Sequence, residues 1–547
     1  MKLAGRGGQL RTFPVYLAAV LAASLLFAGS FPNLLFENGV PLLAWIAYVP
    51  IFWVISQTGV WACAFWGALY GYTAYSIFNY WLSVFHPLAG LIVGIIYLVY
   101  FAFLFPVLKL VLILFPRRGY LIQWIVWMAY EYLRTQGFLG YSYGVTGYSQ
   151  WTVLPVLQIA AIFGVWGVSA LTVFPSSFLA AAFGGEFSTL AGLAARARDF
   201  FRRERIPALI WLATLAGTLI YGFISPVDYS EAKKARIALI QHNTDPWLGG
   251  MSQYRENYRI LKRLSQEALA VDPGPDLVVW SETAFVPRIY WHTTYRTDQE
   301  SYVLVRELLD FLAEQDVPFV IGNDDARRRM SQDGKWEQID YNAAILYDRG
   351  DEAGIYRKLR LVPFTESFPY EKQLPWIYEA LLKADTHFWE KGEKAAVFNA
   401  GGFKFSTPIC FEDTFGSLSR EFVRNGAEVI VNLSNDAWSR SLPAQNQHLS
   451  MAVFRAVETR RAMVRSTASG QTCGIDPNGK ILAMAPPFAM TWLTVEVPVF
   501  TETSIYTRYG DILAQLFLLA ALVILPAGAG RFIMLRIRNK RNQRGQL

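Results

Sequence analysis

The sequence predicts a membrane-embedded bundle of eight α-helical spans joined to an α/β sandwich domain outside the cytoplasm. Three observations lead to this fold class. Apolar residues, 53% of the 547-residue chain, concentrate in 13–224 and 511–535, whereas 231–505 has the composition of a soluble protein. Within 231–505, strand-like runs alternate with helical patterns. Short basic clusters stand beside the apolar runs, as they do around membrane spans.

The membrane spans follow from run length, because a helix needs roughly 20 apolar residues to cross the hydrocarbon core. The eight candidate runs are 13–30, 40–56, 60–80, 88–114, 121–137, 154–183, 207–225 and 511–535. The first run has the basic start and small-residue end of a signal peptide. We expect it to be retained as a helix, since six more spans follow it before the soluble region.

The orientation of the spans follows from the lysines and arginines of the short loops. Loops 115–120 and 184–206 carry seven arginines, whereas loops 31–39, 81–87 and 138–153 have no lysine or arginine. We therefore expect both termini in the cytoplasm and, after seven spans, the soluble region on the periplasmic side of the inner membrane. The expected domains are 1–228 (seven spans), 229–505 (soluble domain) and 506–547 (eighth span and basic tail).

Two charged residues stand near the end of the fifth span. Glu131 and Arg134 are three residues apart and so share one helix face. Charges in a span are costly and often functional, but a structural ion pair explains this spacing equally well.

Charge and cysteine content exclude several classes of protein. The net charge of +7 lies largely in the clusters beside the spans, so we expect no nucleic-acid partner. The three cysteines are not spaced for disulfides or zinc, and no histidine pair has metal-ligand spacing. We expect no metal and no cofactor.

In the soluble region, apolar strand runs are separated by longer helical stretches. The strand runs are 236–241, 276–280, 318–322, 343–347, 405–410 and 428–433, and the helical stretches are 253–271, 299–315 and 445–461. Strands apolar throughout are typical of sheets covered on both faces.

Two of these strand ends carry reactive side chains. Glu282 ends Asp-Leu-Val-Val-Trp-Ser-Glu, and Cys410 lies in Phe-Ser-Thr-Pro-Ile-Cys-Phe-Glu. Reactive groups gather at strand carboxyl ends because the loops there form crevices. A cysteine in an apolar run is more often an inert packing residue, so Cys410 becomes a nucleophile candidate only if Glu282, Lys358 and Glu412 converge on it.

The combined blocks resemble a known family. Trp-Ser-Glu-Thr-Ala (280–284), Tyr-Arg-Lys-Leu-Arg-Leu-Val-Pro-Phe-Thr-Glu (356–366) and Ile-Cys-Phe-Glu (409–412) look like the three catalytic blocks of the nitrilase superfamily. Together with the seven expected spans before them and the one after them, these blocks resemble the apolipoprotein N-acyltransferases. Ser281 and Thr365 stand where Pro and Gly are commoner, which concerns loop detail rather than reacting groups.

The resemblance implies an α-β-β-α sandwich and a set of residue roles. Cys410 is the nucleophile, Glu282 the general base and Lys358 the oxyanion-stabilising cation. Glu366 holds Lys358, and Glu412 lines the pocket. Substrate contacts are expected from Trp247, Asn342, Phe411 and Trp438.

The resemblance also implies the substrates. The acyl donor is a membrane phospholipid, the intermediate is a Cys410 thioester, and the acceptor is the α-amine of the S-diacylglyceryl-cysteine that begins a lipoprotein. We expect the chain to act as a monomer in the bilayer.

Other readings remain open. A membrane-tethered amidase that hydrolyses small amides has the same catalytic blocks, although eight spans are excessive for an anchor. A transporter with an inactive external domain predicts charges deep in the spans. Gly-Tyr-Ser-Tyr-Gly at 140–144 fits a serine-nucleophile pattern, and His448 permits a Cys–His mechanism.

Overall fold

The chain folds into two compact units, formed by Met1–Ser225 with Asp511–Leu547 and by Pro226–Gly510. The computed structural model describes residues 6–85, 89–184, 190–331, 333–383 and 386–544. The first five and last three residues of the expected domains therefore lie outside the described residues.

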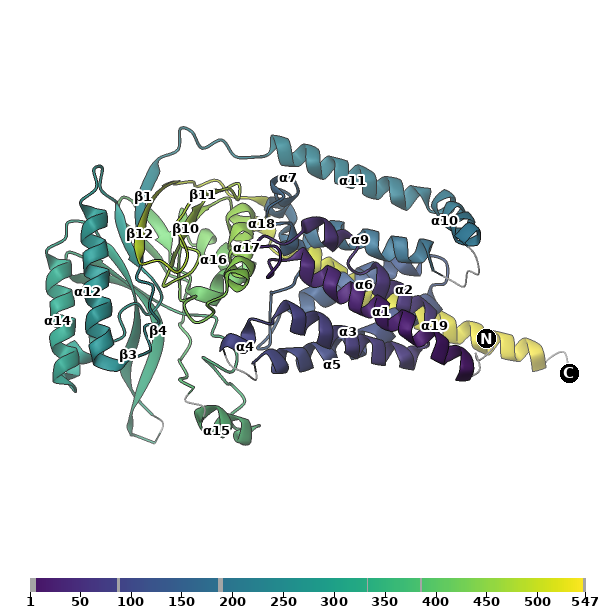
Figure 1. Ribbon diagram of the computed structural model, residues 1–547, viewed down its shortest axis with the longest axis horizontal. Coiled ribbons are helices and arrows are strands. Elements are labelled where there is room, and N and C mark those ends of the chain that lie inside the picture. Colours follow the sequence, from purple (N-terminus) through teal and green to yellow (C-terminus); the bar gives the residue numbers. More distant parts are fainter. Residues whose placement is uncertain (1–5, 86–88, 185–189, 332, 384–385, 545–547) are drawn as a thin grey trace. The chain divides into compact units, whose positions relative to one another are not determined.

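In its described residues, the first unit consists of helices and the loops that join them (Figure 1). Its α-helices and two 3₁₀ helices are α1 (Arg6–Ser30), η1 (Pro41–Trp45), α2 (Val49–Gln57), α3 (Val60–Phe78), α4 (Leu82–Phe85), α5 (Ala89–Leu114), α6 (Gly119–Leu133), η2 (Thr146–Gln150), α7 (Leu154–Leu157), α8 (Ala160–Phe163), α9 (Val165–Ala182), α10 (Leu190–Arg203), α11 (Arg205–Ile224) and α19 (Ile512–Arg544).

Several of these helices are suited to a membrane. Among the described residues, five stretches are long and apolar enough to span one: Thr12–Ser30, Ala89–Leu114, Val165–Ala182, Arg205–Ile224 and Ile512–Asn539. Two of the expected spans are broken into shorter helices. The 40–56 run divides into η1 and α2, and the 154–183 run divides into α7, α8 and α9. The break between α8 and α9 falls at Gly164, whose φ of +64° suits glycine better than a residue with a side chain.

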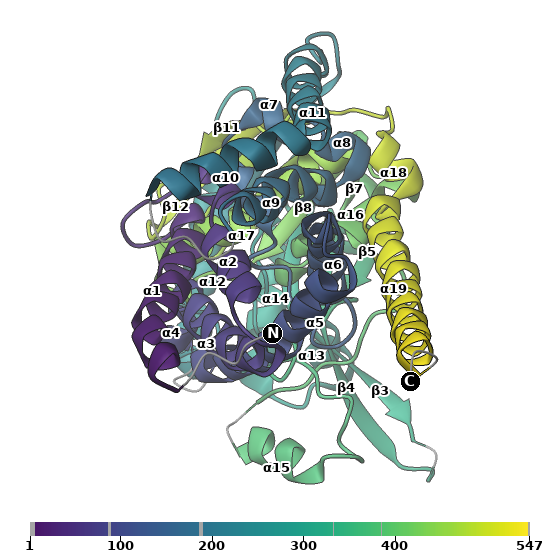
Figure 2. The ribbon, with the colours of Figure 1, turned by 90° about the vertical axis from the view of Figure 1, so that its right-hand side faces the viewer.

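The last helix packs among the first ones. The α19 helix contacts α6, and the two run side by side in Figure 2. The rings of Trp124 and Phe517 meet edge-on with centroids 5.0 Å apart. At the start of α19, Asp511 accepts a hydrogen bond of 2.8 Å from Trp166 Nε1. Helix α19 thus belongs to the first unit, although the whole soluble region lies between it and the other helices of that unit in the sequence.

Glu131 and Arg134 are both buried but bind different partners. Glu131 accepts hydrogen bonds from Thr146 and from Trp127 Nε1. Arg134 Nη1 donates to Tyr97 Oη and to the carbonyls of residues 141 and 143. No ion pair joins the two in the part of the chain that the structure describes, so the ion-pair interpretation is wrong. Both side chains instead anchor the 141–146 segment, and this gives the Gly-Tyr-Ser-Tyr-Gly motif a structural role.

The second unit contains two six-stranded sheets. The first has the order β12 (Thr491–Pro498), β1 (Lys234–Gln241), β2 (Leu277–Trp280), β3 (Phe319–Met330), β4 (Trp336–Asp348) and β5 (Asp351–Arg357). The second has the order β11 (Ile481–Met484), β10 (Cys473–Ile475), β9 (Ala462–Thr467), β8 (Val429–Ser434), β7 (Phe403–Ser406) and β6 (Val397–Ala400).

The two sheets pack face to face through an apolar core. In β1, Ala235, Ile237 and Leu239 belong to the core between the sheets, while Ala238 and Ile240 face the cluster under α12 and α14. Successive strand side chains point to opposite faces. Both faces of β1 are covered, which explains why its sequence is apolar throughout.

Helices cover the outer faces, which completes the expected α-β-β-α sandwich. The described helices of this unit are α12 (Gly250–Leu269), α13 (Ile289–Tyr295), α14 (Gln299–Ala313), α15 (Pro375–Lys383), η3 (Cys410–Thr414), α16 (Gly416–Arg424), α17 (Leu442–Thr459) and α18 (Ile505–Tyr509). Of these, α15 has no buried residue and stands apart from the sheets (Figure 1). In Figure 1, α12 and α14 lie together on one outer face, and α17 packs on β9 in the other sheet. The expected strand at 405–410 ends early, because β7 stops at Ser406 and Cys410 opens η3.

Candidate active site

A buried lysine lies between two carboxylates at the end of β5. Lys358 follows the last residue of this strand and is fully buried. Its Nζ lies 2.8 Å from Glu366 Oε1 and 3.2 Å from Glu282 Oε1. Burial acts to lower the pKa of Lys358, but the two carboxylates outweigh it and raise the pKa well above its ordinary value. The side chain is therefore a buried cation held in place by two carboxylates.

Glu282 is held by donors from three other segments. It lies in the turn after β2 and is 6% exposed. Its Oε1 accepts a 2.8 Å hydrogen bond from Asn342 Nδ2 on β4 besides the contact with Lys358. Its Oε2 accepts a 2.9 Å hydrogen bond from the backbone N–H of Asn435, just after β8. These contacts fix the carboxylate in one orientation.

Cys410 stands at the first position of the η3 turn with a left-handed backbone. Its φ is +51°, which costs a residue with a side chain about 1–2 kcal/mol. Such strain is often kept where a side chain must be presented in a particular direction. Burial and the neighbouring Glu282 raise the pKa of the thiol well above its ordinary value, against an opposing effect of Lys358. The thiol, the base candidate and the cation therefore lie within electrostatic reach of one another.

The two supporting glutamates brace the strands. Glu366 Oε2 accepts a 2.8 Å hydrogen bond from the Val362 N–H, so the carboxylate is fixed at one oxygen and meets Lys358 with the other. Glu412 is fully buried and accepts from the N–H groups of residues 359, 360 and 409 and from Tyr356 Oη, at 2.6–2.9 Å. Glu412 thus ties the Cys410 turn to the segment that carries Lys358, rather than only lining a pocket.

The four expected substrate contacts differ in position. Asn342 is buried against Glu282, as described above, and Phe411 is 9% exposed with its ring edge-on to Phe415. Trp247 is 40% exposed and its ring lies 5.8 Å from that of Trp389. Trp438 is half-buried in the turn after β8. Asn342 therefore belongs to the support of the base, and the two tryptophans remain exposed enough to meet a ligand.

A buried charge cluster beside Cys410 was missed by the sequence analysis. It consists of Asp413, Asp436, His448 and Arg465, all at most 4% exposed. Both ring nitrogens of His448 face carboxylates, which leaves neither as a base for the thiol and removes the support for a Cys–His mechanism. The signal in the sequence was Arg465 directly after the apolar residues 462–464, because a charge that is buried requires a partner.

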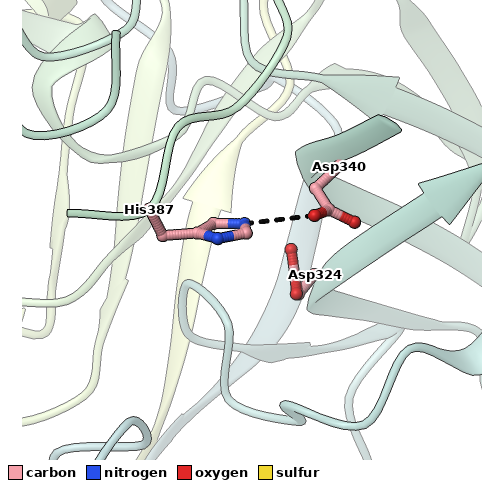
Figure 3. A group of neighbouring side chains, drawn as sticks. All are labelled: Asp324, Asp340 and His387. Carbon is pink, nitrogen blue, oxygen red and sulfur yellow. Dashed lines mark ion pairs between the residues drawn. The ribbon is translucent and has the colours of Figure 1, made fainter. Parts of the chain in front are cut away.

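One group of side chains has the composition of a metal site. Asp324, Asp340 and His387 bring their ligand atoms within 4.8 Å of one another, and His387 pairs with Asp340 (Figure 3). However, Arg288 already lies 2.9 Å from Asp324 and 3.3 Å from Asp340. Trp389 Nε1 also donates to Asp324 at 2.9 Å. A metal ion would have to displace the guanidinium, so we propose no metal site here.

The two-sheet sandwich and its Cys–Glu–Lys arrangement define the class of this protein. Residues 236–505 match the family model for carbon-nitrogen hydrolases, and residues 23–178 match that for the apolipoprotein N-acyltransferase N-terminal domain. The soluble unit therefore has the nitrilase-like fold expected from the sequence.

Full-length relatives then identify the family. The chain is 46% identical to apolipoprotein N-acyltransferase 1 of Treponema denticola over 90% of its own length and 92% of the relative. It is 46% identical to the enzyme of the same name from Treponema pallidum, over 96% and 97% of the two chains. An apolipoprotein N-acyltransferase of Geobacter metallireducens is 32% identical over 93% and 94%. The chain belongs to the apolipoprotein N-acyltransferase family.

Proposed function

We propose that the protein transfers an acyl chain from a membrane phospholipid, through a thioester on Cys410, to the α-amine of the S-diacylglyceryl-cysteine at the N-terminus of a lipoprotein. The observation that carries this proposal is the contact of Lys358 with both Glu282 and Glu366 beside Cys410, in a member of this family. A bound cofactor has no part in this chemistry.

The first half-reaction forms the acyl-enzyme. The thiol is protonated at neutral pH because burial raises its pKa, so Glu282 takes the proton as sulfur attacks the ester carbonyl. The C=O oxygen becomes an oxyanion that the Lys358 ammonium stabilises, an effect whose loss costs about 10²–10³ in rate in comparable sites. The C–O bond then breaks, and the lysophospholipid oxygen takes the proton back from Glu282.

The second half-reaction reverses these roles. The neutral α-amine of the acceptor attacks the thioester carbonyl, and Glu282 takes a proton from the nitrogen. The C–S bond breaks, an amide forms, and the thiolate of Cys410 is reprotonated. One base and one cation serve both steps, which predicts ping-pong kinetics.

We also propose the arrangement in the membrane that the basic loops indicate. Domain 1–228 contributes seven spans, 229–505 is the catalytic domain on the periplasmic side, and 506–547 adds the eighth span and the cytoplasmic tail. The arginines of loops 115–120 and 184–206 support this orientation. A single cysteine placed in loop 184–206 of a Cys-free variant should resist an impermeant maleimide in intact cells, whereas one at Lys335 should react. The reverse pattern would contradict the orientation.

The activity is tested with a phospholipid labelled in one acyl chain and a diacylglyceryl-cysteine lipopeptide. The purified protein in detergent should move the label to the lipopeptide amine, and Cys410→Ala should not. Labelled free fatty acid without labelled lipopeptide, or ammonia released from small amides at a higher rate, would instead favour a tethered hydrolase.

A further inference from the structure

The charge cluster beside Cys410 takes no part in the reaction steps described above. His448, on α17, lies with Nε2 2.7 Å from Asp413 Oδ1 and with Nδ1 3.3 Å from Asp436 Oδ1. Arg465, on β9, pairs with Asp413 and lies 3.5 Å from Asp436 Oδ2. Four ionisable groups from four segments thus meet in the interior.

The two carboxylates of the cluster belong to the two segments that form the site. Asp413 lies in η3, three residues after Cys410. Asp436 follows Asn435, whose N–H holds Glu282 Oε2 at 2.9 Å. His448 bridges the two carboxylates and so joins the turn of the nucleophile to the loop that orients the base.

His448 lies among two carboxylates and one guanidinium, because Arg465 Nη2 also lies 3.2 Å from Nδ1. With a neutral ring, this buried cluster would carry one excess negative charge. A neutral imidazole carries one N–H and can donate to one carboxylate, whereas an imidazolium donates to both. Burial acts to lower the pKa of His448, but Asp413 and Asp436 outweigh burial and the opposing charge of Arg465, and the pKa rises to about 9. The cluster then holds two cations against two anions and is neutral as a whole.

The charge balance acts on Cys410. Besides burial and Glu282, the charge of Asp436 raises the pKa of the Cys410 thiol. His448 and Arg465 are the cations that face Asp436, with Cys473 on β10 as a further titratable neighbour of the cluster. Loss of the imidazolium would leave one unbalanced negative charge near the sulfur and disfavour the thiolate.

We propose that His448 is a positioning residue that acts as an imidazolium, joining the Cys410 turn to the Asn435 loop and neutralising the carboxylates next to the thiol. The inference rests on the proposed function only in taking Cys410 as the nucleophile.

The test measures thiol reactivity and needs no lipid substrate. The rate of Cys410 alkylation by iodoacetamide is followed by peptide mass spectrometry from pH 6 to 10 in the full-length protein. His448→Gln should slow alkylation about tenfold at pH 7.5, and the difference from the wild type should shrink as pH rises through 9, where the imidazolium of the wild type loses its proton. The double variant His448→Gln, Asp436→Asn restores neutrality and should bring the alkylation rate at pH 7.5 back toward that of the wild type. His387→Gln, which removes a partly exposed histidine paired with Asp340, is the matched control and should change nothing.

Two results would overturn the inference. One is an alkylation profile of His448→Gln that coincides with that of the wild type. The other is a double variant whose alkylation rate is no closer to the wild type than that of His448→Gln, as a purely structural role of His448 would give. Fully buried Cys473 reports on folding, because it is alkylated only if the core opens. If His448→Gln opens the core, the single variant Asp436→Asn decides, because the inference requires it to speed Cys410 alkylation at pH 7.5. Absence of phospholipid acyl transfer would contradict the proposed function and leave these profiles unaffected.

Discussion

At the residue scale, Glu282 has the contacts that a shared base requires. Three donors fix its two oxygens, and one of them is the cation expected to stabilise the oxyanion. Glu282→Gln keeps the shape of the side chain but cannot accept a proton at the reacting thiol or amine. Both half-reactions should slow by about 10²–10⁴ in single-turnover measurements of acyl-enzyme formation and of acyl transfer. Slowing of the second step alone would rule out the role.

Glu412 should matter through its position rather than through chemistry. All its described partners are donors, which suits a carboxylate, although burial raises its pKa to about 7. Glu412→Gln turns an NH₂ toward these N–H groups, so at least one is left unpaired at a cost of about 1–3 kcal/mol. The thermal midpoint and the rate of Cys410 acylation should both fall, whereas the exposed Glu421→Gln should leave them unchanged. Equal midpoints for the two variants would contradict the bracing role.

At the element scale, the β2 turn and strand β3 approach so closely that only glycine fits between them. A Cβ on Gly322 would lie 2.2 Å from the Ser281 carbonyl oxygen and 2.5 Å from the Thr283 nitrogen. Gly322→Ala must therefore move the turn that carries Glu282, costing about 1–3 kcal/mol. The rate of acyl transfer should fall by a larger fraction than the free energy of unfolding. Gly274→Ala is the control, because its Cβ would meet nothing closer than 3.6 Å. Equal activity in the two variants would mean that the turn tolerates displacement.

Some strands of the catalytic domain could be predicted from the sequence pattern, and others could not. Strands β1, β2 and β8 are short apolar runs, and their pattern alone locates them. Strand β9 was missed because it carries Arg465, Ser466 and Thr467, polar residues whose partners come from elsewhere in the chain. Strand β12 was missed because it pairs with β1 across the whole domain, a contact that no local pattern records.

The candidate site could likewise be predicted from the sequence only in part. The motif blocks place Glu282, Lys358 and Cys410 at strand ends, but they cannot show that Lys358 meets Glu282 across 76 residues of sequence. The bracing by Glu412 and the charge cluster around His448 depend on three-dimensional contacts between segments. Such contacts become visible only in the folded chain.

At the scale of the whole molecule, the cluster should make stability depend on pH in the alkaline range. The pKa of folded His448, about 9, lies above its ordinary value of 6.5, so its contribution is complete below about pH 6.5 and is lost as pH rises through 9. The contribution is of order 3 kcal/mol. Between pH 7.5 and 10, above the range in which Glu412 titrates, the unfolding midpoint of the wild type in detergent should fall more steeply than that of His448→Gln. Parallel curves would contradict this assignment.

The central claim is that Cys410 carries the acyl chain between two lipid substrates. The most direct measurement is the mass of the Cys410 peptide after incubation with phospholipid, before and after addition of the lipopeptide. The account predicts an increase by one acyl group, sensitive to neutral hydroxylamine, that disappears when the lipopeptide becomes N-acylated. An acyl group on another residue, or one that persists in the presence of the acceptor, would contradict it.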